Sequence, residues 1–273
     1  WRKLTAGESG IKTVTRFPVD GLKSTMAGTV DFVTVDPVTS TGLTERLAEI
    51  AIGEALGQAA IGAKADFPGP LFLAVAPVEV EWPQRLELGR AIGKTEFDYG
   101  DMLRISGGGR YTKYHHRFMF GSVASHLAET FGTKGSPISL STACASGATA
   151  IQLGVEAIRR GEADAALCVG TDGSVNPEAL VRFSLLSALS TQNDPPQAAS
   201  KPFSKNRDGF VMAEGAGAMV LESYESAIAR GAKILGVVAG CGELTDSFHR
   251  TRSSPDGKPI IGCMRKTLAD AGL

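Results

Sequence analysis

The chain has 273 residues, of which 43% are hydrophobic and 21% charged, a composition typical of a folded globular protein and too apolar for extended disorder. Its 28 basic residues balance 29 acidic ones, so no overall positive field is present to hold a nucleic-acid backbone. The longest apolar runs, at 71–77 and 165–169, are far shorter than the roughly 18 to 20 residues that span a bilayer, which argues against membrane insertion.

The first ten residues contain neither an initiator Met nor the apolar core of a signal peptide, so we expect translation to begin upstream of them. The cysteines are far apart, form no Cys-x-x-Cys pair and have no neighbouring His, which argues against a disulfide framework and against a metal site. They are Cys144, Cys168, Cys241 and Cys263. Reduced thiols favour a cytoplasmic protein.

The first predicted element is a helix over 41–59, because Ser40 and Thr41 resemble a helix cap and apolar residues follow at mostly helical spacing. A buried strand is expected at 71–76. Between 77 and 116 the periodicity weakens, which predicts loops and short helices. Long irregular excursions of this kind are often functional.

A short helix is expected near 121–131, and the clearest α/β pattern follows it. Residues 137–143 predict a strand, and apolar residues at helical spacing predict a helix that ends before Gly161. A second buried strand is expected at 165–170. The three elements together predict a βαβ unit.

The remaining elements continue the alternation. An apolar stretch at 210–221 is followed by a helix that ends near Gly231, a strand at 234–239 and a helix at 259–271. A layered α/β fold is therefore predicted, without repeats or a visible domain boundary. The 33 glycines make up about 12% of the chain against a usual share of roughly 7%, which indicates many tight turns and close backbone approaches.

Cys144 lies in the sequence Ser-Thr-Ala-Cys-Ala-Ser-Gly, where the first strand of the βαβ unit turns into its helix. Helix N-termini stabilise a thiolate, and their free N–H groups can stabilise a developing oxyanion. These properties suit a nucleophile for acyl transfer. An equally good interpretation from the residues alone is a small hydrophobic side chain packed at a crowded junction. Cys168 and Cys263 fit core positions, and Cys241 fits the end of a strand.

Motifs spread over nearly the whole chain carry a family resemblance. They include Thr-Ala-Cys-Ala-Ser-Gly at 142–147, Gly-Glu-Ala-Asp at 161–164, Gly-Thr-Asp-Gly at 170–173, Pro-Gln-Ala-Ala-Ser at 196–200, Arg-Asp-Gly-Phe-Val at 207–211 and Glu-Gly-Ala-Gly at 214–217. In this order they resemble the beta-ketoacyl-acyl-carrier-protein synthases of the thiolase-like condensing-enzyme superfamily, and the synthase II type most closely.

The resemblance implies a layered αβαβα fold, represented here mainly by its N-terminal half. Residues 1–273 would form the N-terminal ketosynthase region without its first strand, plus the start of the C-terminal half, with no independent second domain. The resemblance also implies a homodimer whose partner is acyl carrier protein. No cofactor is expected, because the acyl and malonyl thioester substrates are carried on the phosphopantetheine of the carrier protein.

The implied reaction is that of a 3-oxoacyl-[acyl-carrier-protein] synthase in fatty acid elongation. Cys144 takes the acyl chain, and malonyl-carrier protein then loses carbon dioxide and attacks the Cys144 thioester. The backbone N–H of Cys144 would be one of two oxyanion donors. Phe183 aligns with an aromatic residue that lines the acyl pocket, with core packing as the alternative. Tyr114 is the other residue expected at the acyl pocket, and it lies where such enzymes send an aromatic residue across the dimer interface.

The chain also departs from the family pattern. The family uses two histidines for decarboxylation, in a His-Gly-Thr motif and after a later Lys, and neither motif is present. The histidines that are present, His115, His116, His126 and His249, are expected at surface or structural positions. We therefore expect the chain to be part of a longer protein and inactive in condensation alone. Only Arg46, Arg110 and Lys113 match basic positions expected to meet the acidic carrier protein, and ordinary solvated charge explains them equally well.

Three alternatives remain open. A non-catalytic partner of the chain-length-factor type would keep the fold and the dimer surface, but it would not need Cys144. A polyketide ketosynthase would use the same chemistry on another substrate. A cysteine hydrolase would need one of the four histidines to activate water, and none has that context in the sequence.

Overall fold

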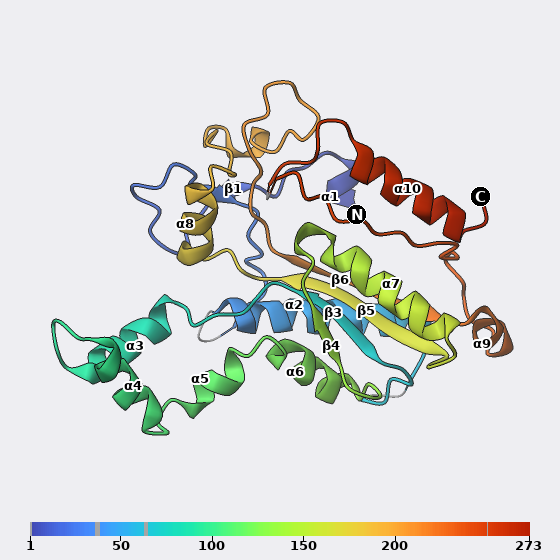
Figure 1. Ribbon diagram of the computed structural model, residues 1–273, viewed down its shortest axis with the longest axis horizontal. Helices are drawn as coiled ribbons and strands as arrows, with labels where there is room; N and C mark the ends of the chain where they lie inside the picture. The colour runs from blue at the N-terminus through green and yellow to red at the C-terminus, as the bar shows by residue number, and fades with distance from the viewer. Residues whose placement is uncertain (1, 36–38, 63–64, 250) are drawn as a thin grey trace. The chain divides into compact units, whose positions relative to one another are not determined.

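The computed structural model describes residues 2–35, 39–62, 65–249 and 251–273 (Figure 1). The chain divides into two compact units, and each is assembled from three segments. The first unit comprises Trp1–Glu49, Ala76–His126 and Thr171–Ala216, and the second comprises Ile50–Val75, Leu127–Gly170 and Gly217–Leu273. The expectation that the chain holds no independent second domain stays a prediction.

A four-stranded sheet in the order β4-β3-β5-β6 belongs mainly to the second unit. Its strands are β3 (Leu71–Val75), β4 (Ile138–Leu140), β5 (Ala165–Asp172) and β6 (Gly215–Glu222). β3 and β4 are parallel, with Leu73 opposite Ser139. All five residues of β3 are buried, as expected for an interior strand of a parallel sheet. The predicted βαβ unit is therefore present, with β3 inserted between its two strands.

Helix α7 (Ser146–Arg159) connects β4 to β5 and packs on β3 (Figure 1). Its apolar face meets the sheet in a cluster that includes Phe72, Ala150, Ala157 and Cys168. The helix ends where Gly161 adopts a positive φ of 68°, a conformation that favours glycine. The predicted helix and its end are both confirmed.

Gly154 allows α7 to approach the sheet closely. A Cβ atom at this position would lie 2.4 Å from the Sγ of Cys168 and 3.1 Å from the Cδ1 of Leu221. Cys168 is only 3% exposed, so its side chain has no free space to move into. The absence of a side chain at Gly154 therefore sets the distance between helix and sheet.

We expect Gly154→Ala to lower the free energy of unfolding by about 1 to 2 kcal/mol, because overpacking outweighs the gain in helix propensity. Adding Cys168→Ala removes the clashing sulfur. The double variant should therefore lose less free energy of unfolding than the sum of the losses in the two single variants. Urea denaturation of the four proteins measures this coupling. Strictly additive effects would show that the two positions do not compete for the same space.

The second unit also contains α9 (Tyr224–Ala229) and α10 (Lys258–Asp270), which confirms the helices expected there. The prediction of a strand at 234–239 is wrong. Residues 232–249 form no strand in the described structure, and Leu235 and Val237 are 80% and 72% exposed. The apolar pattern suggested a buried strand, but no described strand pairs with this segment. An unpaired segment does not form a ladder, and consequently Cys241 does not end a strand.

This irregular segment is nevertheless anchored. The Asp270 carboxylate accepts the N–H of Cys241 at 2.7 Å and pairs with Arg159 at 2.8 Å. Arg159 also donates to the carbonyl of Ala239 at 3.1 Å. The end of α7, the end of α10 and residues 239–241 are thereby held together.

The first unit includes the region 77–116, where loops and short helices were expected and are found. Its helices, with two that continue into segments of the second unit, are α2 (Ser40–Ala59), α3 (Trp82–Ile92), α4 (Tyr99–Gly107), α5 (Thr112–Arg117), α6 (Ser122–Phe131) and α8 (Pro177–Leu185). The shorter elements are α1 (Arg2–Thr5), β1 (Lys12–Thr13), β2 (Met26–Ala27) and η2 (Pro196–Ala198). A hydrophobic cluster that includes Val14, Ala27, Leu180 and Leu189 forms the core around α8.

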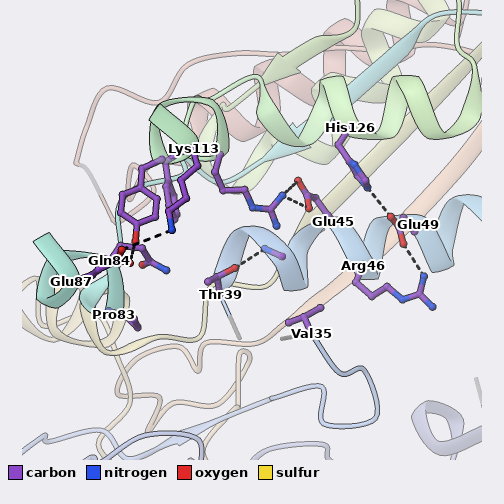
Figure 2. A pocket seen from close by; sticks show the side chains of 14 residues that line it. Val35, Thr39, Glu45, Arg46, Glu49, Pro83, Gln84, Glu87, Lys113 and His126 are labelled. Carbon is purple, nitrogen blue, oxygen red and sulfur yellow. Dashed lines mark hydrogen bonds and ion pairs between the residues drawn. The ribbon is translucent and has the colours of Figure 1, made fainter. Parts of the chain in front are cut away.

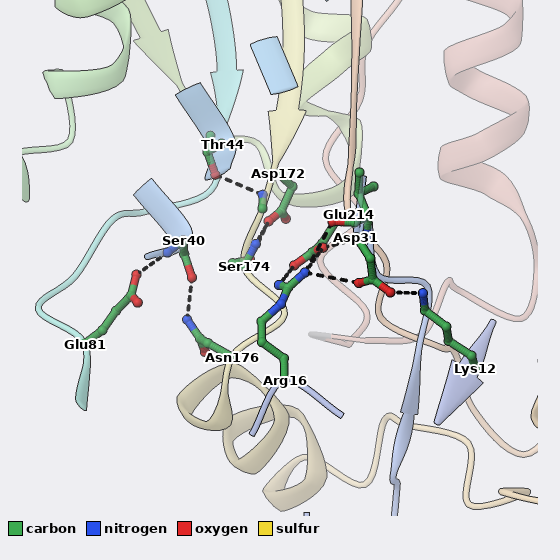
Figure 3. Close-up of polar contacts among 12 residues, drawn as sticks. Lys12, Arg16, Asp31, Ser40, Thr44, Glu81, Asp172, Ser174, Asn176 and Glu214 are labelled. Carbon is green, nitrogen blue, oxygen red and sulfur yellow. Dashed lines mark hydrogen bonds and ion pairs between the residues drawn. The ribbon is translucent and has the colours of Figure 1, made fainter. Parts of the chain in front are cut away.

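A buried ion pair links distant segments of the first unit (Figure 3). Arg16 contacts Glu214 at 2.5 Å, and the Glu214 side chain is fully buried. The same carboxylate accepts the N–H of Val30 at 2.9 Å, and Asp31 pairs with Lys12. The Glu214 carboxylate thus has two partners, the Arg16 guanidinium and the N–H of Val30. Together they compensate its buried charge.

The start of α2 is fixed by polar contacts from two other segments (Figure 3). The Glu81 carboxylate accepts the N–H of Ser40 at 2.7 Å, and the Asn176 amide donates to the Ser40 hydroxyl at 2.8 Å. One turn later, the Thr44 hydroxyl accepts the N–H of Gly173 at 2.9 Å. A carboxylate at a helix N-terminus is favoured by the free N–H groups there.

Burial raises the pKa of Glu81 above its ordinary value, and the charge of Glu178 adds to the effect, although the Ser40 hydrogen bond opposes it. The folded protein therefore binds this proton more strongly than the unfolded chain does. We expect the free energy of unfolding to fall as the pH rises from about 4 through the folded pKa. Glu81→Gln should flatten this part of the curve, as measured by urea denaturation at several pH values. The same change at the exposed Glu54 should leave the curve unaltered.

Within residues 2–35, 39–62, 65–249 and 251–273, no helix is both long enough and apolar enough to cross a membrane.

Candidate functional site

Cys144 lies in the short 3-10 turn η1 (Ala143–Ala145), two residues after the end of β4 and directly before α7. This is the strand–helix junction that the sequence predicts. The thiol is exposed, which removes the alternative of a buried packing residue. An exposed thiol at the start of a helix suits attack on an incoming carbonyl.

The turn before Cys144 has an unusual backbone. Ala143 adopts a φ of 52°, in the left-handed region that costs a residue with a Cβ atom about 1 to 2 kcal/mol. The conformation turns the chain sharply between β4 and α7. Small residues follow this turn. Gly147, on α7, packs against β5: a Cβ atom built at Gly170 of β5 would be in van der Waals contact with the Cα of Gly147, at 3.8 Å. The sequence shows the small residues, but it gives no sign that Ala143 has a positive φ.

Hydroxyl groups hold this turn together. The Ser146 hydroxyl donates to the carbonyl of Ala143 at 2.6 Å and accepts the N–H of Thr142 at 2.8 Å. The Thr142 hydroxyl lies 2.8 Å from that of Thr149, one turn into α7. These contacts span both sides of Cys144 and fix the backbone that carries it.

The turn also meets a residue that the sequence does not indicate. Thr149 donates a hydrogen bond to the Glu243 carboxylate at 3.1 Å. Glu243 comes from the irregular segment 232–249, far along the chain, and belongs to no motif. Such a long-range contact leaves no periodic signal in the sequence.

The other cysteines occupy different environments in the second unit. Burial raises the pKa of Cys168 to about 12, so this thiol stays protonated at neutral pH, and its predicted core position is confirmed. Burial also raises the pKa of Cys241. The Cys263 thiol donates to the carbonyl of Gly242 at 3.1 Å. Of the four cysteines, Cys144 is the exposed one.

Phe183 and Tyr114, the expected acyl-pocket residues, lie in the first unit. Phe183 is partly buried on α8, where it packs against the core cluster and contacts Phe210 edge to face, with 5.3 Å between ring centroids. These are core-packing contacts, the alternative that the sequence left open. Its part in an acyl pocket stays a prediction.

Tyr114 lines a cavity of about 770 Å³ that is formed by parts of α2, α3, α5 and α6 (Figure 2). The tyrosine hydroxyl contacts the Glu87 carboxylate, and its ring stacks on Tyr111 with 5.6 Å between centroids. Burial and the Glu87 contact raise the pKa of Tyr114 to about 12. The hydroxyl is therefore a hydrogen-bond donor at neutral pH. A role at a dimer interface stays a prediction.

Charged groups around the cavity are paired within it (Figure 2). Glu45 accepts two hydrogen bonds from Arg117 at 2.6 Å. Glu49 contacts both Arg46 and His126 at 2.7 Å. The carbonyl oxygen of Gln84 is buried and has no hydrogen-bond partner among the described residues. His126 thus occupies the kind of structural position expected for it, and Arg46 already has a partner in its own chain.

Known proteins resemble this chain over its whole length. Residues 79–227 match the family model described as the beta-ketoacyl synthase N-terminal domain. The chain is 33% identical to a 3-oxoacyl-[acyl-carrier-protein] synthase 2 of Vibrio cholerae, covering 100% of this chain and 65% of that protein. It is 32% identical to the tetracenomycin polyketide synthase ketoacyl synthase alpha subunit of Streptomyces glaucescens, covering 99% of this chain and 64% of that protein.

A solved structure agrees with these relatives. It shows a type II polyketide acyl-carrier protein in complex with its ketosynthase, bound to a hexaketide, and matches with a TM-score of 0.77 and 29% identity. The match covers 100% of this chain and 65% of that one. The chain therefore spans about two thirds of the length of its relatives, and the predicted thiolase-like fold is confirmed. The chain belongs to the beta-ketoacyl synthase family.

Proposed function

We propose that this protein is a 3-oxoacyl-[acyl-carrier-protein] synthase that elongates acyl chains in fatty acid synthesis, acting as a cytoplasmic homodimer with acyl carrier protein as its partner. The observation that carries the proposal is the exposed Cys144 thiol on a fixed turn at the start of α7. The family match supports the same chemistry.

In the first half-reaction, the Cys144 sulfur attacks the thioester carbonyl of an acyl chain on the carrier protein. A bond forms between that sulfur and the carbonyl carbon, and the oxygen carries negative charge in the tetrahedral intermediate. The backbone N–H of Cys144 is proposed as one donor to this oxygen. The carrier thiol then leaves with the proton from Cys144, and the acyl group stays on the enzyme.

In the second half-reaction, a malonyl unit on the carrier protein loses its carboxyl group as carbon dioxide. The electron pair left on carbon attacks the Cys144 thioester, and the bond to sulfur breaks. The product is a 3-oxoacyl chain two carbons longer on the carrier protein, and the Cys144 sulfur leaves as a thiolate that takes a proton from water to regenerate the thiol. No oxidant or cofactor is needed for the balance.

A polyketide ketosynthase is the second candidate. The 32% identity to the tetracenomycin ketoacyl synthase alpha subunit, over nearly the whole chain, favours it as much as the bacterial synthase 2 relatives favour fatty acid elongation. A non-catalytic partner of the chain-length-factor type is less favoured, because it has no use for an exposed cysteine at the helix start.

The test is to incubate the protein with acyl-carrier protein and isotopically labelled malonyl-carrier protein, and to identify products by mass spectrometry. A single two-carbon extension of saturated chains supports the fatty-acid role. Repeated extension without loss of the oxo groups supports the polyketide role. Labelled malonyl groups that never enter a longer chain, with no acyl group on Cys144, would contradict both.

A further inference from the structure

The Ser146 side chain holds the backbone just before Cys144 in its uncommon conformation. The left-handed φ of 52° at Ala143 is disfavoured for alanine by about five- to thirtyfold in population. The Ser146 hydroxyl donates to the carbonyl of Ala143 at 2.6 Å, and the backbone N–H of Ser146 donates to the same carbonyl. The hydroxyl also accepts the N–H of Thr142 at 2.8 Å. One side chain thus closes the turn in which the strained residue lies.

This hydroxyl is not used as a helix cap. Ser146 is the first residue of α7, and the cap residue before it is Ala145, which has no polar side chain. Alanine is a poor cap residue, whereas serine is among the best. The hydroxyl is instead directed back into the turn, which indicates that its task concerns the backbone around Cys144.

The carbonyl that Ser146 holds belongs to the same peptide group as the N–H of Cys144. This peptide bond is trans, so its C=O and its N–H point in opposite directions within one plane. Two donors on the oxygen therefore fix the direction of the N–H as well. A hydrogen bond to the oxygen also polarises the group, which strengthens its N–H as a donor by about 10–30% for each bond.

The N–H of Cys144 has no hydrogen-bond acceptor within residues 2–35, 39–62, 65–249 and 251–273. The hydrogen bonds that form the turn come from the next two residues instead. Ala145 donates to the carbonyl of Thr142 at 3.2 Å, and Ser146 donates to that of Ala143. An N–H that is fixed in direction and has no acceptor of its own is preorganised for an oxyanion.

We propose that Ser146 is a positioning residue for acyl transfer, which holds the Ala143 carbonyl and thereby directs the N–H of Cys144 at the oxyanion. The inference rests on the proposed function, because that oxyanion forms in the first half-reaction. Ser146 forms no bond to the substrate and exchanges no proton with it. Its hydroxyl keeps both hydrogen bonds while the Cys144 sulfur adds to the thioester and the carrier thiol leaves.

Two reactions of the Cys144 sulfur distinguish the position of the N–H from the reactivity of the thiol. Acyl transfer from acetyl-N-acetylcysteamine passes through an oxyanion, whereas alkylation by iodoacetamide displaces iodide and forms none. The thiolate fraction enters both rates and cancels in their ratio. Peptide mass spectrometry follows the two adducts on Cys144. A role limited to stability would not change this ratio.

Ser146→Ala is expected to lower the acylation-to-alkylation ratio about ten- to a hundredfold, less than the roughly hundred- to thousandfold loss when an oxyanion donor is removed outright. Ser146→Thr keeps the hydroxyl and should restore the ratio to within about threefold. Ser122→Ala is the matched control and should leave the ratio unchanged. Ser122 is the first residue of α6, and its hydroxyl likewise donates to a preceding carbonyl, that of Arg117, at 3.0 Å.

A second variant tests the same turn from its strained residue. Glycine adopts the left-handed conformation without the cost that alanine has. Ala143→Gly added to Ser146→Ala should therefore recover part of the lost ratio, about fivefold or more. Urea denaturation checks that each variant folds. If Ser146→Ala alone does not fold, the double variant and Ser146→Thr provide the comparison.

The outcomes separate this role from the proposed function. An unchanged ratio in Ser146→Ala, with normal acylation of the unmodified protein, would overturn the positioning role and leave the proposed function standing. An equal loss in Ser122→Ala would also overturn it, because loosening of any helix start would then be sufficient. If iodoacetamide modifies Cys144 in the unmodified protein but the thioester never does, the proposed function is contradicted, and the positioning role with it.

Discussion

Cys144→Ala is expected to abolish acylation of the protein, with at least about a thousandfold less acyl adduct, because the attacking sulfur is gone and no other described thiol is both exposed and at a helix start. The measurement is mass spectrometry of the intact protein after incubation with acyl-carrier protein.

A second cysteine-to-alanine variant and a measurement of unfolding distinguish loss of the nucleophile from loss of the fold. Cys263→Ala removes a partly exposed thiol on α10 and should leave the acyl adduct intact. Cys144→Ala should unfold at nearly the same urea concentration as the unmodified protein, since its side chain is exposed and packs little. An acyl adduct that persists in Cys144→Ala would show that a different residue is the nucleophile.

Gly69→Ala is expected to lower the free energy of unfolding by about 3 kcal/mol or more. A Cβ at Gly69 would lie 1.9 Å from the carbonyl oxygen of Ala165, which is the first residue of β5. Backbone atoms cannot move aside as a flexible side chain can. The strand start would have to shift, together with the Gly69 carbonyl that accepts the N–H of Lys134 at 2.8 Å.

Gly53→Ala is the matched control, because no atom lies within 4 Å of the position of its Cβ on α2. There the same methyl group should stabilise the helix by up to about 1 kcal/mol. Urea denaturation of both variants measures the difference. Equal and small effects would show that β5 can move away from Gly69 at no cost.

Much of the local structure could be predicted from the sequence. Helix α7 and the buried strands β3 and β5 have strong apolar patterns and clear ends, and the place of Cys144 between β4 and α7 follows from that pattern. The strand at 234–239 could not be judged correctly, because an apolar pattern indicates burial but does not supply a neighbouring strand for pairing. Pairing depends on segments remote in the chain, which periodicity does not report.

The site could be predicted only in part. The cysteine has a local signal in the small residues around it, whereas the hydroxyl of Thr149 and the carboxylate of Glu243 meet only through the folded chain. The positive φ of Ala143 was also hidden, because glycine is the residue that usually signals such a backbone. Phe183 shows the reverse case: its type and position suggest a pocket, and its described contacts are those of a core residue.

The assembly of each unit from three separate segments has a consequence for biosynthesis. The segment with Cys144 leaves the ribosome well before Gly217–Leu273, which completes the same unit with most of β6, α10 and Glu243. During that interval the edge of β5 with which β6 pairs is open, and long-range contacts of this kind form slowly. The nascent chain therefore passes through a stage in which this edge of β5 is still unpaired, when protection by chaperones matters most.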